Sequence, residues 1–151
     1  MLTAIAATGA GFLTAVLWFD LMFDVQVRKH AGDTLPDDVL ASIRAYYRRV
    51  TTDATPMNRL ISAVMLTTLA AIGFEIVKGS VPLWVSLTSF AAALSAIGLA
   101  AVRTVGNAVR LGAATDSVTV QTQLARTIYR DHVYCLAAMT MVAALQLIGA
   151  H

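Results

Sequence analysis

The side chains best suited to acid–base chemistry in this chain stand where its hydrophobic segments end. Asp20 and Asp24 lie four residues apart at the end of one uncharged run, and the pair Asp131-His132 precedes another. A carboxylate can act as a general base when burial raises its pKa, and a histidine exchanges protons near neutral pH. These four residues are therefore the candidate catalytic residues. His132 is expected to point into the bundle and to hydrogen-bond an acidic or amide partner from another helix.

Amide and guanidinium groups occupy the edges of the same hydrophobic segments. The candidate ligand-binding residues are Asn58, Arg59, Arg103, Asn107 and Arg110. Arg103, Asn107 and Arg110 are spaced i, i+4 and i+7, which places them on one helix face. Guanidinium groups bind anionic or carbonyl-bearing molecules in a bidentate manner. The sequence thus predicts a small-molecule or ion site, in which the acids are expected to contact Arg59 or Arg103.

A simpler interpretation of the same polar residues is that they form interfacial ion pairs which terminate membrane helices. A charge at the bilayer centre costs about 2.5–3.5 kcal/mol on insertion scales, but the cost is far lower at the boundary. Spacing alone does not choose between a site and a set of interfacial ion pairs.

Composition assigns the chain to the membrane. It has 151 residues, of which 58% are hydrophobic and 13% charged, against about 25% charged in soluble domains. Its mean hydropathy is +0.70. No basic run long enough to bind nucleic acid occurs, and the single cysteine excludes an internal disulfide and a C-x-x-C motif.

The expected fold is an all-α integral membrane four-helix bundle with up-down-up-down topology, formed by residues 1–151 as one domain. About 20 apolar residues cross the ~30 Å hydrocarbon layer, and the spans are predicted at about 2–23, 58–77, 82–103 and 132–150. The first segment lacks the basic region of a signal peptide and is interpreted as a retained span.

Three local features complete the predicted architecture. Residues 36–50 have the pattern of an amphipathic interfacial helix, which lies on the membrane surface or packs over the mouth of the bundle as a lid, with Val39, Ile43 and Val50 toward lipid or the spans. Glu75 and Lys78 are expected to pair at the membrane interface. Gly112 is expected to end the extension of the third span.

The distribution of basic residues predicts the orientation. Ten of the eleven lysines and arginines flank the connections after spans one and three, and Lys78 alone lies on the other side. The positive-inside rule places the basic side in the cytoplasm, so both termini of this inner-membrane protein are expected outside it.

A metal site is a further alternative. His132, Cys135 and Met139 are spaced i, i+3 and i+7 and carry donors that suit copper. Cysteine and methionine are also common apolar fillers, and packing is the preferred interpretation. No cofactor follows from the sequence.

The layout resembles the anthrone-oxygenase-like family of small four-helix membrane proteins. The residues that carry this resemblance are Gly9-Ala10-Gly11-Phe12 with Trp18-Phe19-Asp20, Pro56-Met57-Asn58, Gly106-Asn107, and the segment 126–132. The chain departs from that pattern in having no proline beside Asn107 and in carrying Asp131-His132 where an asparagine is expected. The resemblance implies cofactor-independent oxygenation of polycyclic phenols and suggests Asn58, Asn107 and His132 as site residues.

Three functions remain open on the sequence. The first is a membrane enzyme or binding protein for a lipophilic or anionic small molecule, with oxidoreductase chemistry as one form of it. The second is a channel or transporter, which would need a homo-oligomer because one four-helix bundle is too thin for a wide pore. The third is a structural or accessory subunit of a membrane complex. No acid is expected at mid-depth in the bilayer, which argues mildly against a proton-coupled transporter.

Overall fold

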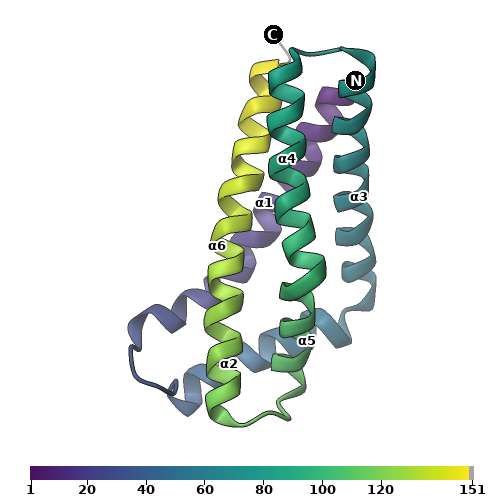
Figure 1. The fold of residues 1–151 in the computed structure, drawn as a ribbon. Helices are drawn as coiled ribbons and strands as arrows, with labels where there is room; N and C mark the ends of the chain where they lie inside the picture. Colours follow the sequence, from purple (N-terminus) through teal and green to yellow (C-terminus); the bar gives the residue numbers. More distant parts are fainter. Residues whose placement is uncertain (150–151) are drawn as a thin grey trace.

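A computed structural model describes residues 1–149, and every regular element among them is helical. The four long helices are α1 (Leu2–Asp24), α3 (Thr55–Lys78), α4 (Leu83–Leu99) and α6 (Val118–Gly149), and they pack side by side (Figure 1). Four segments are long and apolar enough to cross a membrane: Leu2–Lys29, Pro56–Lys78, Leu83–Ala113 and Val118–Gly149. The chain is therefore a multi-pass membrane protein, as its composition predicts.

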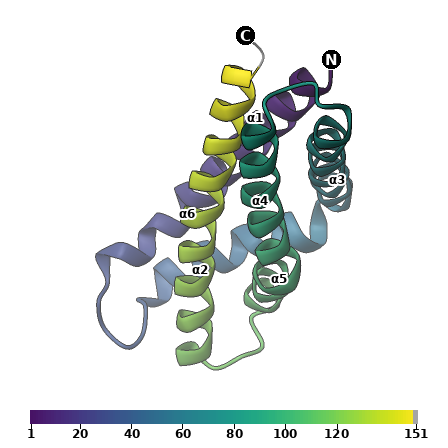
Figure 2. The same cartoon turned by 45° about the horizontal axis from the view of Figure 1, so that its top comes forward.

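The shorter elements gather at one end of this bundle. They are η1 (Val25–Lys29), α2 (Asp37–Arg48), η2 (Arg49–Asp53), η3 (Ala100–Thr104) and α5 (Val105–Ala113). Figure 2 shows α2 and α5 beside the lower part of α6, with α2 below α3 and α5 below α4, while the α3–α4 connection and the N-terminus lie at the opposite end. The elements η2 and η3 are π-helical turns, a wider helix that is frequent at functional sites.

The core has two parts, and they follow from two kinds of sequence. Between the long helices the buried residues include many alanines, such as Ala6, Ala10 and Ala93, and such small residues let membrane helices approach closely. Between α2, α5 and α6 larger side chains are buried, among them Leu40 and Ile43. The amphipathic α2 thus closes one end of the bundle.

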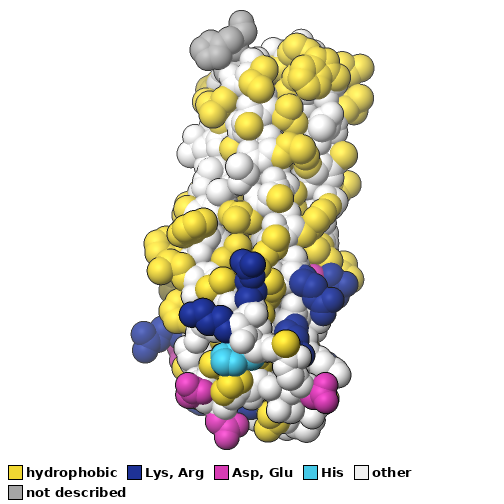
Figure 3. Space-filling view, turned by 90° about the vertical axis from the view of Figure 1, so that its left-hand side faces the viewer, with side chains coloured by type: hydrophobic (Ala, Val, Ile, Leu, Met, Phe, Trp, Pro, Cys, Tyr) yellow, Lys and Arg dark blue, Asp and Glu magenta, His cyan; other side chains and the backbone are white. Residues whose placement is uncertain are grey.

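Charged side chains gather around the same end. In the space-filling view of Figure 3 the lysine, arginine, aspartate and glutamate side chains lie in the lower part of the molecule, and hydrophobic side chains dominate above them. The exposed hydrophobic residues include Trp18, Leu66, Phe74 and Leu94 on the long helices. An apolar belt with one charged end is the surface expected of a protein that crosses a bilayer.

The helix bounds differ from the sequence prediction mainly in length. The fourth helix begins at Val118 rather than near residue 132 and continues unbroken to Gly149. The segment predicted at 36–50 is helical from Asp37 and passes into the π-turn η2. Within it Ile43 is fully buried, whereas Val39 and Val50 are only partly buried.

Two local expectations were wrong. Glu75 does not pair with Lys78 at the surface: its side chain is fully buried, and no ion pair joins the two among the described residues. Three residues after Glu75 the helix has turned Lys78 to the exposed side of α3. Gly112 does not end its helix either, because α5 continues to Ala113 and Ala114 takes the left-handed conformation, with φ of 55°.

Gly112 instead allows two helix backbones to approach closely. A Cβ atom at this position would lie 2.7 Å from the backbone nitrogen of Arg48 and 2.9 Å from its Cα. These are main-chain atoms of α2, so neither can swing aside. The glycine is therefore required for α2 to dock on α5.

We predict that Gly112→Ala destabilises the protein by about 1–3 kcal/mol, the usual cost of overpacking. Gly106→Ala in the same helix is the matched control, because a Cβ there meets nothing within 4 Å and alanine is the better helix former by about 1 kcal/mol. Thermal unfolding in detergent measures both variants. Equal melting temperatures for the two would contradict the close approach of α2 and α5.

Candidate functional site

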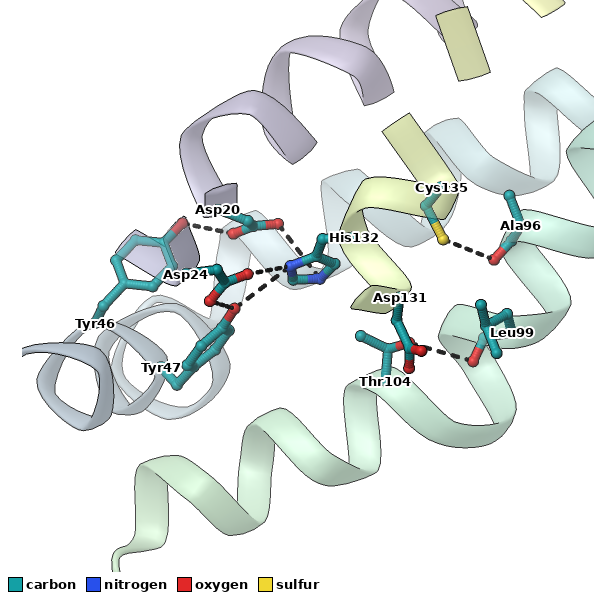
Figure 4. Close-up of polar contacts among 10 residues, drawn as sticks. All are labelled: Asp20, Asp24, Tyr46, Tyr47, Ala96, Leu99, Thr104, Asp131, His132 and Cys135. Carbon is teal, nitrogen blue, oxygen red and sulfur yellow. Dashed lines mark hydrogen bonds and ion pairs between the residues drawn. The ribbon is translucent and has the colours of Figure 1, made fainter. Parts of the chain in front are cut away.

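The centre of the candidate site is a buried pair formed by Asp24 and His132. Asp24 stands at the last position of α1 and His132 lies in the middle of α6. The Oδ2 atom of Asp24 lies 2.7 Å from Nδ1 of His132 (Figure 4). The Asp24 side chain is fully buried, and a buried carboxylate needs hydrogen-bond donors. His132 therefore donates through Nδ1–H, and Nε2 of the neutral ring keeps its lone pair.

Two neighbouring tyrosines of α2 hold the two carboxylates of α1. The hydroxyl of Tyr47 donates to Oδ1 of Asp24 at 2.6 Å, and the hydroxyl of Tyr46 donates to Oδ1 of Asp20 at 2.6 Å. Oδ2 of Asp20 lies 3.9 Å from Nε2 of His132, on the side of the ring opposite Asp24. The spacing of four residues between Asp20 and Asp24 places both acids on one face of α1.

The tyrosine hydroxyls are fixed as donors. Burial raises the pKa of Tyr46, and the nearby Asp20 carboxylate raises it further. Burial also raises the pKa of Tyr47 well above its usual value, with the Asp24 carboxylate adding to the effect. Both hydroxyls therefore stay protonated at physiological pH and keep the carboxylates oriented.

Asp131 belongs to a separate ion pair beside this centre. Arg103 on η3 donates from both Nε and Nη2 to the two oxygens of Asp131, and Nε lies 3.0 Å from Oδ2. The hydroxyl of Thr104 donates to the same Oδ2 at 3.0 Å. The aspartate side chain is 2% exposed and the arginine 52%. This arrangement fastens the π-turn η3 to α6 and leaves Asp131 without a free oxygen.

The aspartate–histidine centre opens onto a cavity of about 520 Å³, a size within the ~300–1,000 Å³ of small-molecule pockets. Its wall is mostly apolar and draws on all four long helices, with Leu13, Ile61, Ile97 and Met139 as examples. The polar groups that reach the wall are few: Asp20, Tyr46, Tyr47, Thr51, Asn58, Ser62, Thr104 and His132. Asp24 lies behind His132 and does not line the cavity.

The predicted ligand-binding residues are dispersed. Asn58 lines the cavity and donates to the backbone carbonyl of Thr51 at 3.0 Å. Arg59 is exposed, Asn107 is half-buried, and neither lines the cavity. Arg110 pairs with Asp116 at 3.0 Å. Arg103 is bound to Asp131, and no arginine among the described residues lines the cavity.

The sequence predicts that the acids of α1 contact Arg59 or Arg103, and this prediction is wrong: no hydrogen bond or ion pair joins them among the described residues. Their partners are Tyr46, Tyr47 and His132 instead. The expectation for His132 itself is confirmed, since the ring is buried and bonds an acid from another helix.

The geometry does not support the alternative of a metal site at His132, Cys135 and Met139. Within residues 1–149 no group of three or more histidine, cysteine, aspartate or glutamate side chains could hold a metal ion. Cys135 and Met139 also line the cavity, one and two turns after His132 on α6, and the thiol of Cys135 lies 3.6 Å from the carbonyl oxygen of Ala96.

The arrangement has the parts of a general base. A carboxylate that accepts Nδ1–H holds the imidazole in one tautomer and stabilises the imidazolium that forms when Nε2 takes a proton. His132 lines the cavity and Asp24 lies on its far side. A molecule in the cavity with an acidic hydrogen near Nε2 would meet a base already oriented by Asp24 and, through it, by Tyr47.

Neither tyrosine was among the predicted site residues. Both tyrosines fit the apolar face of an amphipathic helix, so that pattern alone offers no reason to assign their hydroxyls a polar role. One signal could have identified them: α2 carries two adjacent tyrosine hydroxyls, and α1 carries two acids one turn apart, Asp20 and Asp24, that need hydrogen-bond donors. The contribution of Thr104 depends on the π-turn η3 and has no comparable signal.

Comparison with known proteins gives no assignment: no family model, no curated protein and no solved structure matches the chain. The function must therefore be inferred from the site.

We predict that Tyr47→Phe lowers the free energy of unfolding by about 1.5–3 kcal/mol, because it removes a hydrogen bond to a buried charged group. Tyr46→Phe is the matched variant one residue away, on the less buried Asp20, and should cost only about 0.5–1.5 kcal/mol. Urea unfolding in mixed micelles compares the two. A larger loss of unfolding free energy for Tyr46→Phe than for Tyr47→Phe would contradict the conclusion that the buried Asp24 depends more strongly on its tyrosine donor than Asp20 does.

Proposed function

We propose that this protein binds a small lipophilic molecule in the cavity and removes a proton from it, with His132 as the base. The observation that carries the proposal is the Asp24–His132 pair at the polar end of a mainly apolar cavity. The favoured substrate class is a polycyclic phenol or a related molecule with one acidic hydrogen. The anionic alternative loses support because the basic residues lie outside the cavity wall.

The rim of the cavity suits entry from the membrane. Five residues of its wall are also exposed, and four of them are apolar: Phe19, Met57, Val105 and Val109, with Ser62 as the polar exception. A lipophilic molecule dissolved in the bilayer would reach the cavity along such a surface without crossing a polar barrier. Asp20, Asn58 and the hydroxyls of Tyr46 and Tyr47 would then orient its polar group beside His132.

The proton transfer balances within these groups. Nε2 of His132 takes the acidic proton, the molecule becomes an anion, and the Asp24 carboxylate stabilises the imidazolium. Asp20 stands 3.9 Å from Nε2 and could relay the proton onward. An oxidoreductase role rests in addition on the resemblance to the anthrone-oxygenase-like family, in which a deprotonated phenol would react with dioxygen without a cofactor.

We further propose the placement in the membrane. The four spans would run up-down-up-down, with α2 at the cytoplasmic surface of the inner membrane and both termini outside the cytoplasm. The basic residues around the connections after spans one and three support this orientation. The site would then lie near the cytoplasmic boundary.

Cysteine labelling tests the orientation. In a Cys135→Ala background, Asp33→Cys and Thr115→Cys should react only with a reagent that enters the cytoplasm. Ser80→Cys, in the α3–α4 connection, is the matched control and should react from outside. External labelling at residue 33 or 115 would reverse the orientation.

The binding site is tested with 2-naphthol, a fluorescent bicyclic phenol, added to the purified protein. Ala96→Phe should abolish binding, because Ala96 is buried in the cavity wall. Ala91→Phe introduces the same ring on an exposed face of α4 and should bind as the unaltered protein does. Equal binding by both variants would show that the probe does not use the cavity.

The role of His132 has a separate readout. The fraction of bound naphthol in its ionised form should rise with pH as the imidazole loses its proton and becomes able to act as a base. His132→Gln keeps a hydrogen-bonding side chain but cannot accept the proton, so the ionised fraction should fall while the probe still binds. An unchanged pH profile in this variant would remove His132 from the proposal.

A further inference from the structure

A second group of buried polar residues lies at the opposite end of the bundle. Glu75 of α3, Ser86 and Ser89 of α4 and Gln146 of α6 all have 0% of their surface exposed. Ionisable residues enclosed within membrane helices are costly and are by default candidates for function. The proposed function does not involve any of these four residues.

Packing contacts place these residues within about one helical turn of one another in depth. Glu75 stands three residues before the end of α3 at Lys78, and Ser86 stands three residues after the start of α4 at Leu83. Both are therefore one turn away from the short α3–α4 connection. Beside this turn, Gly73 of α3 lies against the ring of Phe90 on α4, which fixes the register of the two helices.

The last turn of α6 reaches the same level. Gly149 packs against Val81 and Val85 of the α3–α4 connection and the first turn of α4. Gln146 lies three residues earlier on α6, which brings it level with Ser86, and Ser89 is one turn deeper. Three helices thus contribute polar side chains to one buried layer.

The polar atoms of this layer have no protein partner. Both carboxylate oxygens of Glu75, the hydroxyl oxygens of Ser86 and Ser89, and the amide oxygen and nitrogen of Gln146 make no hydrogen bond with any part of residues 1–149. Lys78, the nearest basic residue in sequence, is exposed. Buried polar groups are almost always satisfied, so six such atoms in one layer point to a bound species.

An apolar barrier separates this layer from the His132 site. Ala6, Ile72, Ala93, Met139 and Val142 form part of the core between the two ends of the bundle. The two groups of polar residues therefore lie in different parts of the bundle.

We propose that Glu75, Ser86, Ser89 and Gln146 form a binding site for a small monovalent cation, with Na⁺ as its ligand. Hard cations take oxygen ligands, and the layer offers five: two from the carboxylate, two hydroxyls and one amide oxygen. A single positive charge neutralises the single carboxylate, whereas a divalent ion would leave a net charge buried in a low-dielectric layer. The cation binds all three helices together at the outer end of the bundle.

The test measures thermal unfolding of the full-length protein in detergent at fixed ionic strength, with Na⁺, K⁺ or choline as the cation. Ligand that binds only the folded state raises the melting temperature with each tenfold increase in concentration. We expect a rise of a few degrees per tenfold increase in Na⁺, a smaller one in K⁺ and none in choline. Calorimetric titration of the same sample with NaCl should give a saturable heat.

Glu75→Gln should abolish the Na⁺ dependence while the protein still folds, because the amide removes the charge and keeps the shape. Ser89→Ala removes one hydroxyl without changing charge and should shift the response to higher Na⁺. Asp38→Asn, at an exposed acid of α2, is the charge-matched control and should retain the full response.

Two results would overturn the proposal. Equal melting temperatures in Na⁺, K⁺ and choline, with no heat on titration, would show that no cation binds. A stability that depends on pH but not on Na⁺, and loses that dependence in Glu75→Gln, would show that Glu75 is held as a protonated acid instead. Neither result bears on the His132 site, which the naphthol measurements test separately.

Discussion

The burial of the Asp24 carboxylate is the constraint around which one end of this molecule is organised. A carboxylate without exposure to water must be given donors, and here the donors come from two other elements: His132 on α6 and Tyr47 on α2. The three groups lie far apart in the sequence, so the charge can be satisfied only when α1, α2 and α6 are all in place. Assembly of the site and closure of the bundle by α2 are consequently the same event.

The requirement extends outward from Asp24. Tyr47 reaches the carboxylate only if α2 lies close beneath the bundle, and Gly112 permits that distance by leaving space for the backbone of α2. On the other side, the π-turn η3 is fastened to α6 by the contacts of Arg103 and Thr104 with Asp131. Both π-turns border the cavity, so the irregular parts of the helices are those that shape its wall.

The sequence predicts the class and the general position of the site well. Hydrophobic length is enough to assign four apolar helices, because a bilayer fixes how many residues a span needs. The prediction that His132 bonds an acidic or amide partner on another helix follows from the similar depth of Asp20 and His132 at the ends of their spans. The sequence does not show which basic residue pairs with which acid. Arg103 could equally face Asp20 or Asp131 until the rotation of α6 and the geometry of the π-turn are known.

Glu75 shows the same limit most clearly. In sequence it stands three residues from Lys78, and a surface pair is the natural interpretation of that spacing. In the fold Glu75 faces inward and Lys78 outward, so the acid lies in the bundle with Gln146 and two serines.

The buried carboxylates at the two ends of the bundle therefore have different surroundings. At the α2 end the protein supplies its own donors, Tyr47 and His132, to the carboxylate of Asp24. At the other end no donor from residues 1–149 reaches the carboxylate of Glu75, and this is the reason for proposing a cation there. The proposed organic ligand and the proposed cation would therefore occupy separate ends of the bundle.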